Sequence, residues 1–246
     1  DWFEPFNWNK TGIPNLNYEV IIPNTPNDPF LASANEIAFA KKITLKSNAE
    51  LTIISELNTN LSRSEIQTLL DNGETILDIM GIGVTPSSFI GLNYGGGIIF
   101  YIEADGTGLV AAPSDIGSSI TWGCRGTTID GADARPIGTG YQNTMDILAG
   151  CSQTGIAAEM CNSLDLNGYT DWFLPSVEEV EEMYSKIGHG AAAPNTNIGN
   201  FANSGIYWSS SESTDIRAFG VLFSSVDTRA GLPKDGSHRV RPIRAF

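Results

Sequence analysis

The densest group of carboxylates in the chain is a run of four glutamates, at Glu178, Glu179, Glu181 and Glu182. Two carboxyl groups can act as general acid and general base when burial or charge pushes their pKa values apart. Glu178 and Glu182 are four residues apart on a predicted helix and therefore share one face. Nothing nearby in the sequence is expected to bury them, so the pattern favours a solvated helix face over acid–base catalysis.

Side chains for metal-assisted or triad chemistry are few. The chain has two histidines, His189 and His238, which is little material for a histidine-built metal site or a Ser-His-Asp triad. Three acids, Asp130, Asp133 and Asp165, could form an oxygen-rich site for a hard cation. We therefore expect no cofactor, apart from a structural calcium ion that these acids could hold.

The three cysteines, Cys124, Cys151 and Cys161, lack the C-x-x-C spacing of a zinc site or a redox motif. An odd number of cysteines in an exported protein favours one disulfide and one buried thiol. Cys161 falls on the apolar side of a helical pattern over residues 155–164, which suits a buried thiol. We therefore predict a disulfide between Cys124 and Cys151.

Two polar segments near the C-terminus, residues 209–217 and 224–239, are the best candidates for binding. Each lies between predicted strands, and together they mix acids, guanidinium groups, hydroxyls and one imidazole. Loops on a rigid scaffold often bind ligands, and ordinary solvated connections are the alternative. The predicted ligand-binding residues are Trp208, Ser211, Glu212, Asp215, Arg217, Asp227, Arg229, Lys234, Asp235, His238 and Arg239.

The net charge of −14 argues against nucleic acid as a partner, because phosphate binding requires a basic surface. A solvated acidic surface that keeps an exported protein soluble explains this charge best. No run of about eighteen apolar residues is present, so we expect no transmembrane segment. The chain opens at Asp1 without a charged and apolar leader, so we expect any export signal to be absent or already removed.

Residues 1–57 are predicted to be a β-rich, stalk-like module. Short β-branched runs over 18–22, 42–46 and 50–54 are separated by Pro, Asn and Gly clusters. A segment of this size buries little core alone, so we expect it to be part of a longer array.

Residues 58–93 change character and hold three short helical patterns, over 65–71, 74–80 and 84–90. Their spacing suggests a small helical spacer. We interpret it as a connector that positions the flanking domains rather than as a binding element.

Residues 94–246 are predicted to form the main domain. A buried strand over 95–102 is followed by an Asp-Gly turn and a partner strand. Helices come next and strands last, which predicts a compact α+β domain whose final strand returns beside the first. The remaining predicted elements are a strand over 108–112, helices over 143–149, 154–165 and 177–187, and strands over 206–210, 218–223 and 239–246.

The helix over 177–187 has the clearest local signals. Ser176 can cap its first turn and Glu179 completes a capping box. Apolar residues recur at three- and four-residue steps along one face. Gly188 is expected to end the helix in a left-handed conformation.

Seven blocks carry a resemblance to a known family: GGGIIFYIEADGTGLVAAPSD, TWGC, GTGYQNT, AGC, GYTDWFLPS, YWSSSES and RVRPIRAF. Over residues 94–246 the chain resembles the C-terminal domain of Legionella collagen-like protein. The resemblance implies a C-type-lectin-like fold with small antiparallel sheets and two to three helices. A shorter match near residues 7–23 resembles modules of large surface proteins of the Bacteroidetes.

In such a fold, residues 171–175 would form a wedge between the second helix and the small sheet. Trp172 and Phe173 would be core anchors, Pro175 would set the entry to the following helix, and Asp171 would bind loop backbone. The motif would therefore be scaffold rather than catalyst.

Two activities known among proteins with related folds are not supported by the residues present. Sugar-binding C-type lectins use Glu-Pro-Asn or Gln-Pro-Asp with Trp-Asn-Asp, and none occurs in residues 94–246. Enzymes of the formylglycine-generating type need a late cysteine pair, whereas the last cysteine here is Cys161. We therefore expect no enzyme.

The sequence predicts an extracellular, cell-surface adhesin or ligand-binding protein that uses its polar loops to contact a glycan or a protein on a host, prey or neighbouring cell. Upstream stalk or filament domains are expected as further partners. The alternatives are a receptor-binding tip of a virion or filament, including a retroelement-diversified one, and a structural cap of a surface assembly.

Overall fold

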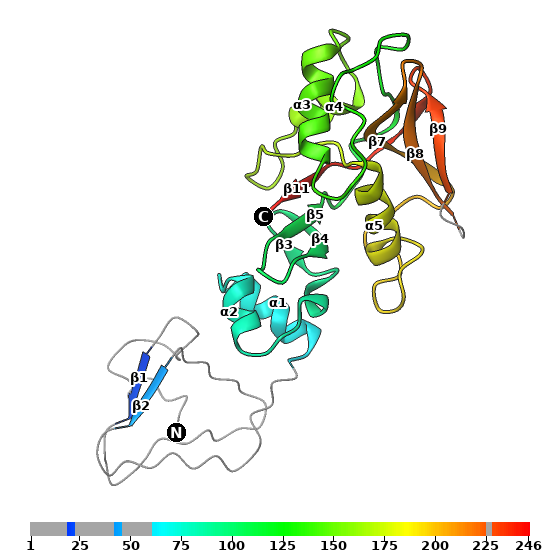
Figure 1. Cartoon of the computed structure of the whole chain (residues 1–246). Helices are drawn as coiled ribbons and strands as arrows, with labels where there is room; N and C mark the ends of the chain where they lie inside the picture. Colours follow the sequence, from blue (N-terminus) through cyan, green and yellow to red (C-terminus); the bar gives the residue numbers. More distant parts are fainter. Residues whose placement is uncertain (1–18, 23–41, 46–60, 225–227) are drawn as a thin grey trace.

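The computed structural model describes residues 19–22, 42–45, 61–224 and 228–246. They form an α+β fold of short helices and small sheets, which confirms the predicted class (Figure 1). Near the N-terminus, β1 (Glu19–Ile22) pairs in parallel with β2 (Lys42–Leu45), at two predicted strand positions. The strand predicted over 50–54 lies outside the described residues.

Each described helix overlaps a predicted helical segment, although α1, α2 and α3 extend beyond the predicted bounds. Those before the main sheets are α1 (Arg63–Asp71), α2 (Ile76–Gly81) and the 3-10 helix η2 (Pro86–Phe89). Those between the sheets are α3 (Gly140–Gly150), α4 (Ala157–Asn162) and α5 (Val177–Ile187).

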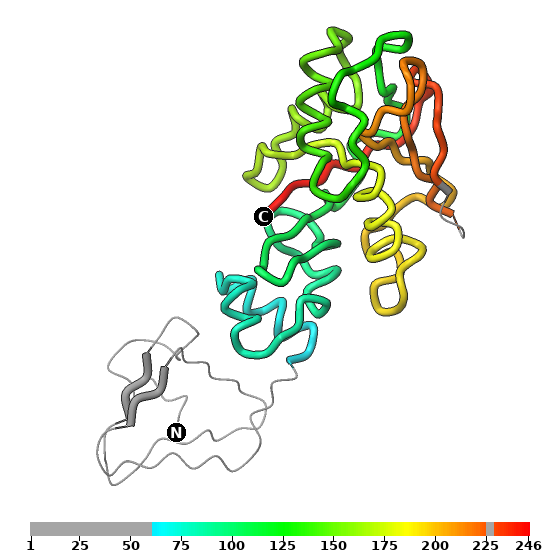
Figure 2. Tube along the Cα trace, in the orientation of Figure 1, coloured from blue at the N-terminus to red at the C-terminus, as the bar shows by residue number. Residues whose placement is uncertain are grey.

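The C-terminal strand returns to the sheet that opens the main domain. β11 (Ile243–Ala245) pairs antiparallel with β5 (Gly108–Ala111), which pairs with β4 (Gly97–Ile102), and β3 (Asn93–Tyr94) completes the sheet. The last strand thus joins the sheet of the first, with β5 between β11 and β4. Figure 2 shows this C-terminal stretch, in red, crossing the body of the chain.

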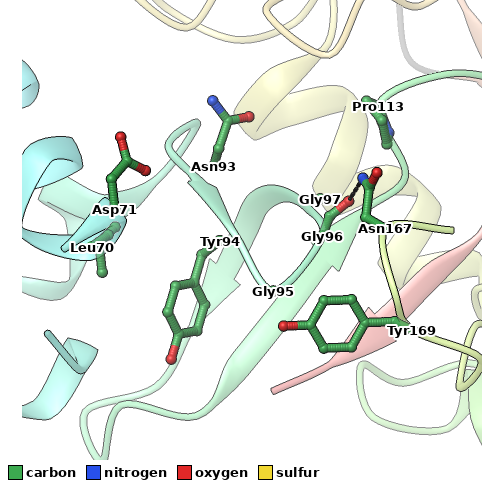
Figure 3. A pocket seen from close by; sticks show the side chains of 10 residues that line it. All are labelled: Leu70, Asp71, Asn93, Tyr94, Gly95, Gly96, Gly97, Pro113, Asn167 and Tyr169. Carbon is green, nitrogen blue, oxygen red and sulfur yellow. Dashed lines mark hydrogen bonds between the residues drawn. The ribbon is translucent and has the colours of Figure 1, made fainter. Parts of the chain in front are cut away.

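The turn between β3 and β4 is made of glycines. Gly95 and Gly96 have positive φ angles of 53° and 83°, a conformation that glycine adopts readily. With Tyr94 on one side and Tyr169 on the other, this turn lines a surface hollow (Figure 3).

A second sheet holds five strands, and its order is β6 (Gly117–Thr121), β10 (Ser237–Val240), β7 (Gly205–Thr214), β8 (Arg217–Phe223) and β9 (Thr228–Pro233). β10 and β7 are parallel, and the other neighbours are antiparallel. In Figure 1, β7, β8 and β9 lie side by side, with α3 and α4 on one side of them.

Two predictions about this sheet need correction. The single strand predicted over 239–246 is two strands in different sheets, β10 and β11, and the break falls at Arg241-Pro242. Proline has no N–H to donate to a ladder, which favours a break there. The segments expected to be loops are also largely strand, because β7 continues to Thr214, while β9 and β10 occupy most of 228–240.

Three consecutive side chains of the Asp171–Pro175 stretch enter three different hydrophobic cores. Trp172, 1% exposed, packs in the core beneath α1 and α2, and Phe173 packs in the core beneath α5. Leu174 packs in the core beneath α3 and α4. Phe173 also exchanges two backbone hydrogen bonds with Ile243, at 2.8 and 3.0 Å. Trp172 and Phe173 therefore lie where core anchors were predicted, and the stretch links the cores.

The segment interpreted as a spacer is packed onto the main domain. Ile66 and Ile79, on α1 and α2, share a core with Ile99 and Val110 on β4 and β5. The interpretation as a connector is corrected accordingly, because residues 61–92 contribute to the core of the body that follows them.

The capping of α5 is as predicted, but two details differ. The Ser176 side chain accepts from the Glu179 N–H and the Glu179 carboxylate accepts from the Ser176 N–H, forming the capping box. Glu179 is fully buried and also accepts from the Gly138 N–H at 2.8 Å. It therefore does not belong to the solvated helix face that was predicted for the four glutamates. Burial raises the pKa of Glu179. Gly188 has φ −99°, so the helix does not end in a left-handed residue.

Asp171 has a different role from the one predicted. Its carboxylate accepts from Arg244 Nε and Nη2 at 2.7 and 2.8 Å instead of binding loop backbone. The hydrogen bond from Arg244 lowers the pKa of Asp171. The pair fixes β11 to the Asp171–Pro175 stretch.

None of the helices in the described part of the chain combines the length and apolar character that crossing a lipid bilayer requires.

Replacing Leu174 with Ala should lower the free energy of unfolding by about 2–5 kcal/mol, because a fully buried leucine leaves a cavity. Leu77→Ala is the matched control: Leu77 is 59% exposed, so the same change should cost less than about 0.5 kcal/mol. Urea unfolding followed by tryptophan fluorescence measures both. Equal losses in the two variants would contradict the placement of Leu174 in a core.

Candidate binding surface

Four of the predicted ligand-binding residues face the interior. Trp208, Ser211 and Lys234 are 0% exposed and Glu212 is 5% exposed. The Trp208 indole N–H donates to the Ile120 carbonyl at 2.9 Å, and the Ser211 hydroxyl donates to the Ala134 carbonyl at 2.7 Å. These four side chains support the surface from below and are not exposed on it.

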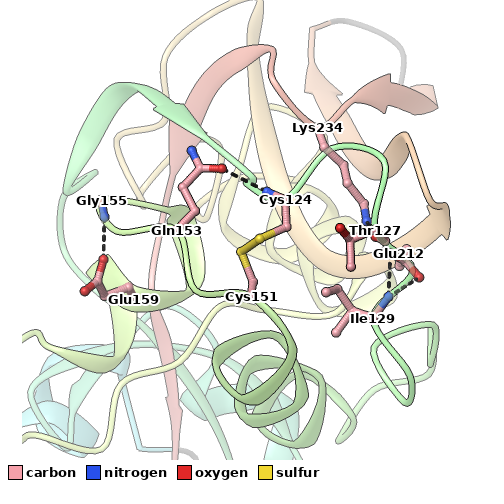
Figure 4. Close-up of a disulfide and its surroundings, with 9 residues drawn as sticks. All are labelled: Cys124, Thr127, Ile129, Cys151, Gln153, Gly155, Glu159, Glu212 and Lys234. Carbon is pink, nitrogen blue, oxygen red and sulfur yellow. Dashed lines mark hydrogen bonds and ion pairs between the residues drawn. A yellow bond between two sulfur atoms is a disulfide. The ribbon is translucent and has the colours of Figure 1, made fainter.

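Lys234 and Glu212 form a buried ion pair at the centre of this support (Figure 4). Lys234 Nζ also donates to the Thr127 carbonyl at 2.8 Å and lies 4.5 Å from the centroid of the Trp122 ring. Both carboxylate oxygens of Glu212 accept from the Ile129 N–H at 3.1 Å. The pair therefore joins β7, the turn between β9 and β10, and residues 122–129.

Backbone hydrogen bonds tie the same three segments together. The Lys234 carbonyl accepts from the N–H groups of Trp122 and Gly123 at 3.0 and 3.1 Å. The Lys234 N–H donates to the Ile216 carbonyl at 3.1 Å, and the Gly126 N–H donates to the Asp215 carbonyl at 2.8 Å. The turns that end β7 and β9 thus form one surface with residues 122–129.

A disulfide between Cys124 and Cys151 anchors this surface to the end of α3, and the pairing is the one predicted from the sequence (Figure 4). The Cys124 N–H donates to Gln153 Oε1 at 3.0 Å. Cross-linking residues 27 positions apart removes chain entropy from the unfolded state, worth about 3–4 kcal/mol. Cys161 is a free, buried thiol as expected, and burial raises its pKa.

Four exposed charged residues stand on this surface, and we call them the charged rim: Arg125, Asp215, Arg217 and Asp235. Arg125 and Asp235 form an ion pair at 3.3 Å with side chains 50% and 64% exposed. Arg217 donates to the Gly231 carbonyl at 2.5 Å. Arg125 was not predicted, although its place beside a cysteine expected to be cross-linked could have indicated a fixed position.

The remaining predicted residues lie away from the rim or outside the described residues. Arg229 forms a two-pronged ion pair with Glu181 on α5, at 2.6 and 2.5 Å, and Arg239 pairs with Asp115 at 3.0 Å. His238 packs edge-on against Trp208, with ring centroids 4.7 Å apart. Asp227 lies outside the described residues.

The three acids considered for a cation do not come together in a metal site. Asp130, Asp133 and Asp165 are all exposed. Within residues 61–224 and 228–246, no group of three potential ligands has a geometry that could hold a metal ion. A structural calcium ion stays a prediction without a site in the described structure.

Replacing Lys234 with Met should lower the free energy of unfolding by about 3–5 kcal/mol, because Glu212 would keep a buried charge without its partner. Adding Glu212→Gln should recover part of the loss, since a neutral amide can still accept from Ile129. Lys186→Met is the control: its pair with Glu182 is exposed, so the change should cost less than about 1 kcal/mol. Urea unfolding measures all three, and a loss below about 1 kcal/mol for Lys234→Met would contradict the buried pair.

Burial lowers the pKa of His238. Histidine in the unfolded chain has a pKa of about 6.5, so His238 binds a proton more readily in the unfolded chain than in the folded one. Stability should therefore fall as the pH drops below about 6.5. His238→Gln should remove this part of the pH dependence. NMR titration of the two histidine rings, assigned with His189→Gln, checks the cause, and a His238 pKa at or above about 6.5 would refute it.

Comparison with known proteins shows to which family the chain belongs. No curated protein matches the chain. A fimbrial protein from Bacteroides ovatus has a similar solved structure, with 14% identity and a TM-score of 0.40 over 56% of this chain and 36% of that one, so this chain spans about a third of that protein. The family model of the Lcl C-terminal domain matches residues 114–244. Because that match covers more than half of the 246 residues, the chain belongs to the Lcl C-terminal domain family.

Proposed function

We propose that this chain is an exported, non-enzymatic, surface-associated binding protein that uses its charged rim to contact a partner on another cell. Family membership supports the surface-associated role. In this proposal the main domain is the C-type-lectin-like recognition unit implied by the sequence resemblance, carried on the β-rich residues 1–57.

One observation carries the proposal: four exposed charges from three segments are held on a rigid base. The base consists of the Lys234–Glu212 pair, the Cys124–Cys151 disulfide and the backbone bonds between the segments. A surface that is ordered before binding loses little conformational freedom on contact, which favours affinity.

The rim favours a protein partner over a simple polyanion or polycation. It carries two guanidinium groups and two carboxylates, and Ile216, 39% exposed, lies between Asp215 and Arg217. Complementary charges give register and specificity at protein interfaces, and arginine is enriched there. A glycan is the other class of partner predicted from the sequence, and the experiment below also tests for it.

Beads coated with the full chain should adhere to cell layers, and Arg125→Ala with Arg217→Ala should reduce adhesion at least about tenfold, because the loss at one contact multiplies over many contacts. Lys186→Ala, which removes an exposed cation on α5, is the matched control and should adhere normally. Protease treatment of the cells should abolish adhesion if the partner is a protein, whereas glycan-array binding, with or without calcium, that the double rim variant loses would identify a glycan at the rim. Unchanged adhesion of the double variant would overturn the proposal, and symmetric trimers in native mass spectrometry would favour a filament tip.

A further inference from the structure

A surface hollow of about 570 Å³ lies apart from the charged rim, where α1 ends and β3 turns into β4 (Figure 3). This volume is within the range of sites that hold a small molecule. The lining residues come from four stretches of chain: Leu70 and Asp71, residues 93–97, Pro113, and Asn167 with Tyr169.

Contacts with the protein hold the walls in place. The Arg244 guanidinium donates to the Gly95 carbonyl at 3.0 Å and lies 3.9 Å from the centroid of the Tyr169 ring. Asn167 Nδ2 donates to the Gly96 carbonyl at 2.8 Å, which ties one wall to the turn. On the other side, the Gln67 side chain exchanges two hydrogen bonds with the Asn93 backbone, at 3.0 and 2.8 Å.

The glycines keep side chains out of the hollow. A Cβ atom on Gly96 would lie 2.7 Å from the Tyr169 ring, and one on Gly95 would lie 2.8 Å from Arg244 Nη1. Both contacts are shorter than Cβ atoms tolerate, so this wall stays bare backbone between two tyrosines.

The groups around this bare wall suit an uncharged, polyhydroxylated ring. Tyr94 and Tyr169 are half-buried and present flat apolar rings with polar tips, while the Asn93 and Asn167 amides and the Asp71 carboxylate are exposed. Amides both donate and accept, and a carboxylate accepts from hydroxyl groups. In Figure 3 the Tyr169 hydroxyl points toward the Gly95 turn, with Asn93 and Asp71 on the far side.

The same groups disfavour an anionic ligand. Asp71 contributes a negative charge, and the nearby cation, Arg244, is already paired with Asp171. The net charge of −14 also disfavours an anionic ligand.

We propose that this hollow binds one neutral sugar residue, with a tyrosine against its apolar face and the Asp71 and Asn167 side chains on its hydroxyls. This site is separate from the charged rim and does not depend on the rim's function.

The test is an NMR titration of the full chain with neutral sugars: glucose, galactose, mannose, N-acetylglucosamine and their disaccharides. At least one should shift the backbone amide signals of Gly95, Gly96 and Gly97 in a saturable way, and its sulfated counterpart should bind at least about fivefold more weakly. Asp71→Ala and Asn167→Gly should each weaken binding about tenfold, corresponding to the loss of one or two hydrogen bonds. Glycine is chosen at position 167 because Asn167 has a positive φ of 56°, which glycine keeps without strain.

Two controls separate this site from the rest of the surface. Asp133→Ala removes an exposed carboxylate elsewhere and should leave sugar binding unchanged, as should the double rim variant Arg125→Ala with Arg217→Ala. The proposal is overturned if no sugar shifts the glycine signals, if Asp133→Ala weakens binding as much as Asp71→Ala, or if the sulfated sugar binds more tightly. Loss of cell adhesion in the rim variant alone would leave this result unaffected, so the two proposals fail separately.

Discussion

Trp172, Phe173 and Leu174 are adjacent in the chain, yet each packs in a different hydrophobic core. In extended backbone, successive side chains point to opposite sides, so a short stretch can reach several elements without changing direction. The backbone pairing of Phe173 with Ile243 places this stretch beside the C-terminal strand. The relative positions of both main sheets and of helices α1 to α5 therefore depend on packing around these three residues. A change there should affect sites that it does not touch.

The two proposed binding regions are supported in different ways. Under the charged rim, a lysine and a glutamate are buried together, which is costly unless both are hydrogen-bonded. Here each has further backbone partners, Thr127 for the lysine and Ile129 for the glutamate. Beside the hollow, the buried Arg244 pairs with the exposed Asp171 and also holds the glycine turn. In both places, hydrogen bonds with a charged side chain hold backbone segments in position, and apolar packing would otherwise have to do so.

Local signals in the sequence were sufficient for part of this structure. The capping box of α5, the strands on either side of Asp105-Gly106 and the Cys124–Cys151 pair follow from residues that are close together or few in number. Burial of polar residues was not predictable in the same way. Ser211 and Glu212 resemble loop residues, but they lie within β7, where their partners include Ala134, Ile129 and Lys234.

The charged rim was predicted only in part, again because local sequence signals do not reveal which polar residues are buried. Asp215, Arg217 and Asp235 were identified because they are polar residues between strands. Lys234 and Glu212 were included with them, although one faces the other inside the protein. Their pairing joins positions that are distant in sequence, and no local pattern distinguishes a buried ion pair from two solvated charges. The packing of α1 and α2 on β4 and β5 is likewise a long-range contact, which helical periodicity alone does not reveal.

The placement of the rim relative to α1 has a mechanical consequence. The turns that end β7 and β9 and the helix α1 lie at opposite ends of the described body (Figure 1). Tension between a partner held at the rim and residues that precede α1 would run lengthwise through the molecule. It would load the junction of Phe173 with Ile243 and the three cores around it. The Cys124–Cys151 cross-link lies near the rim, so it would reinforce the end that holds the partner and would not reinforce this junction.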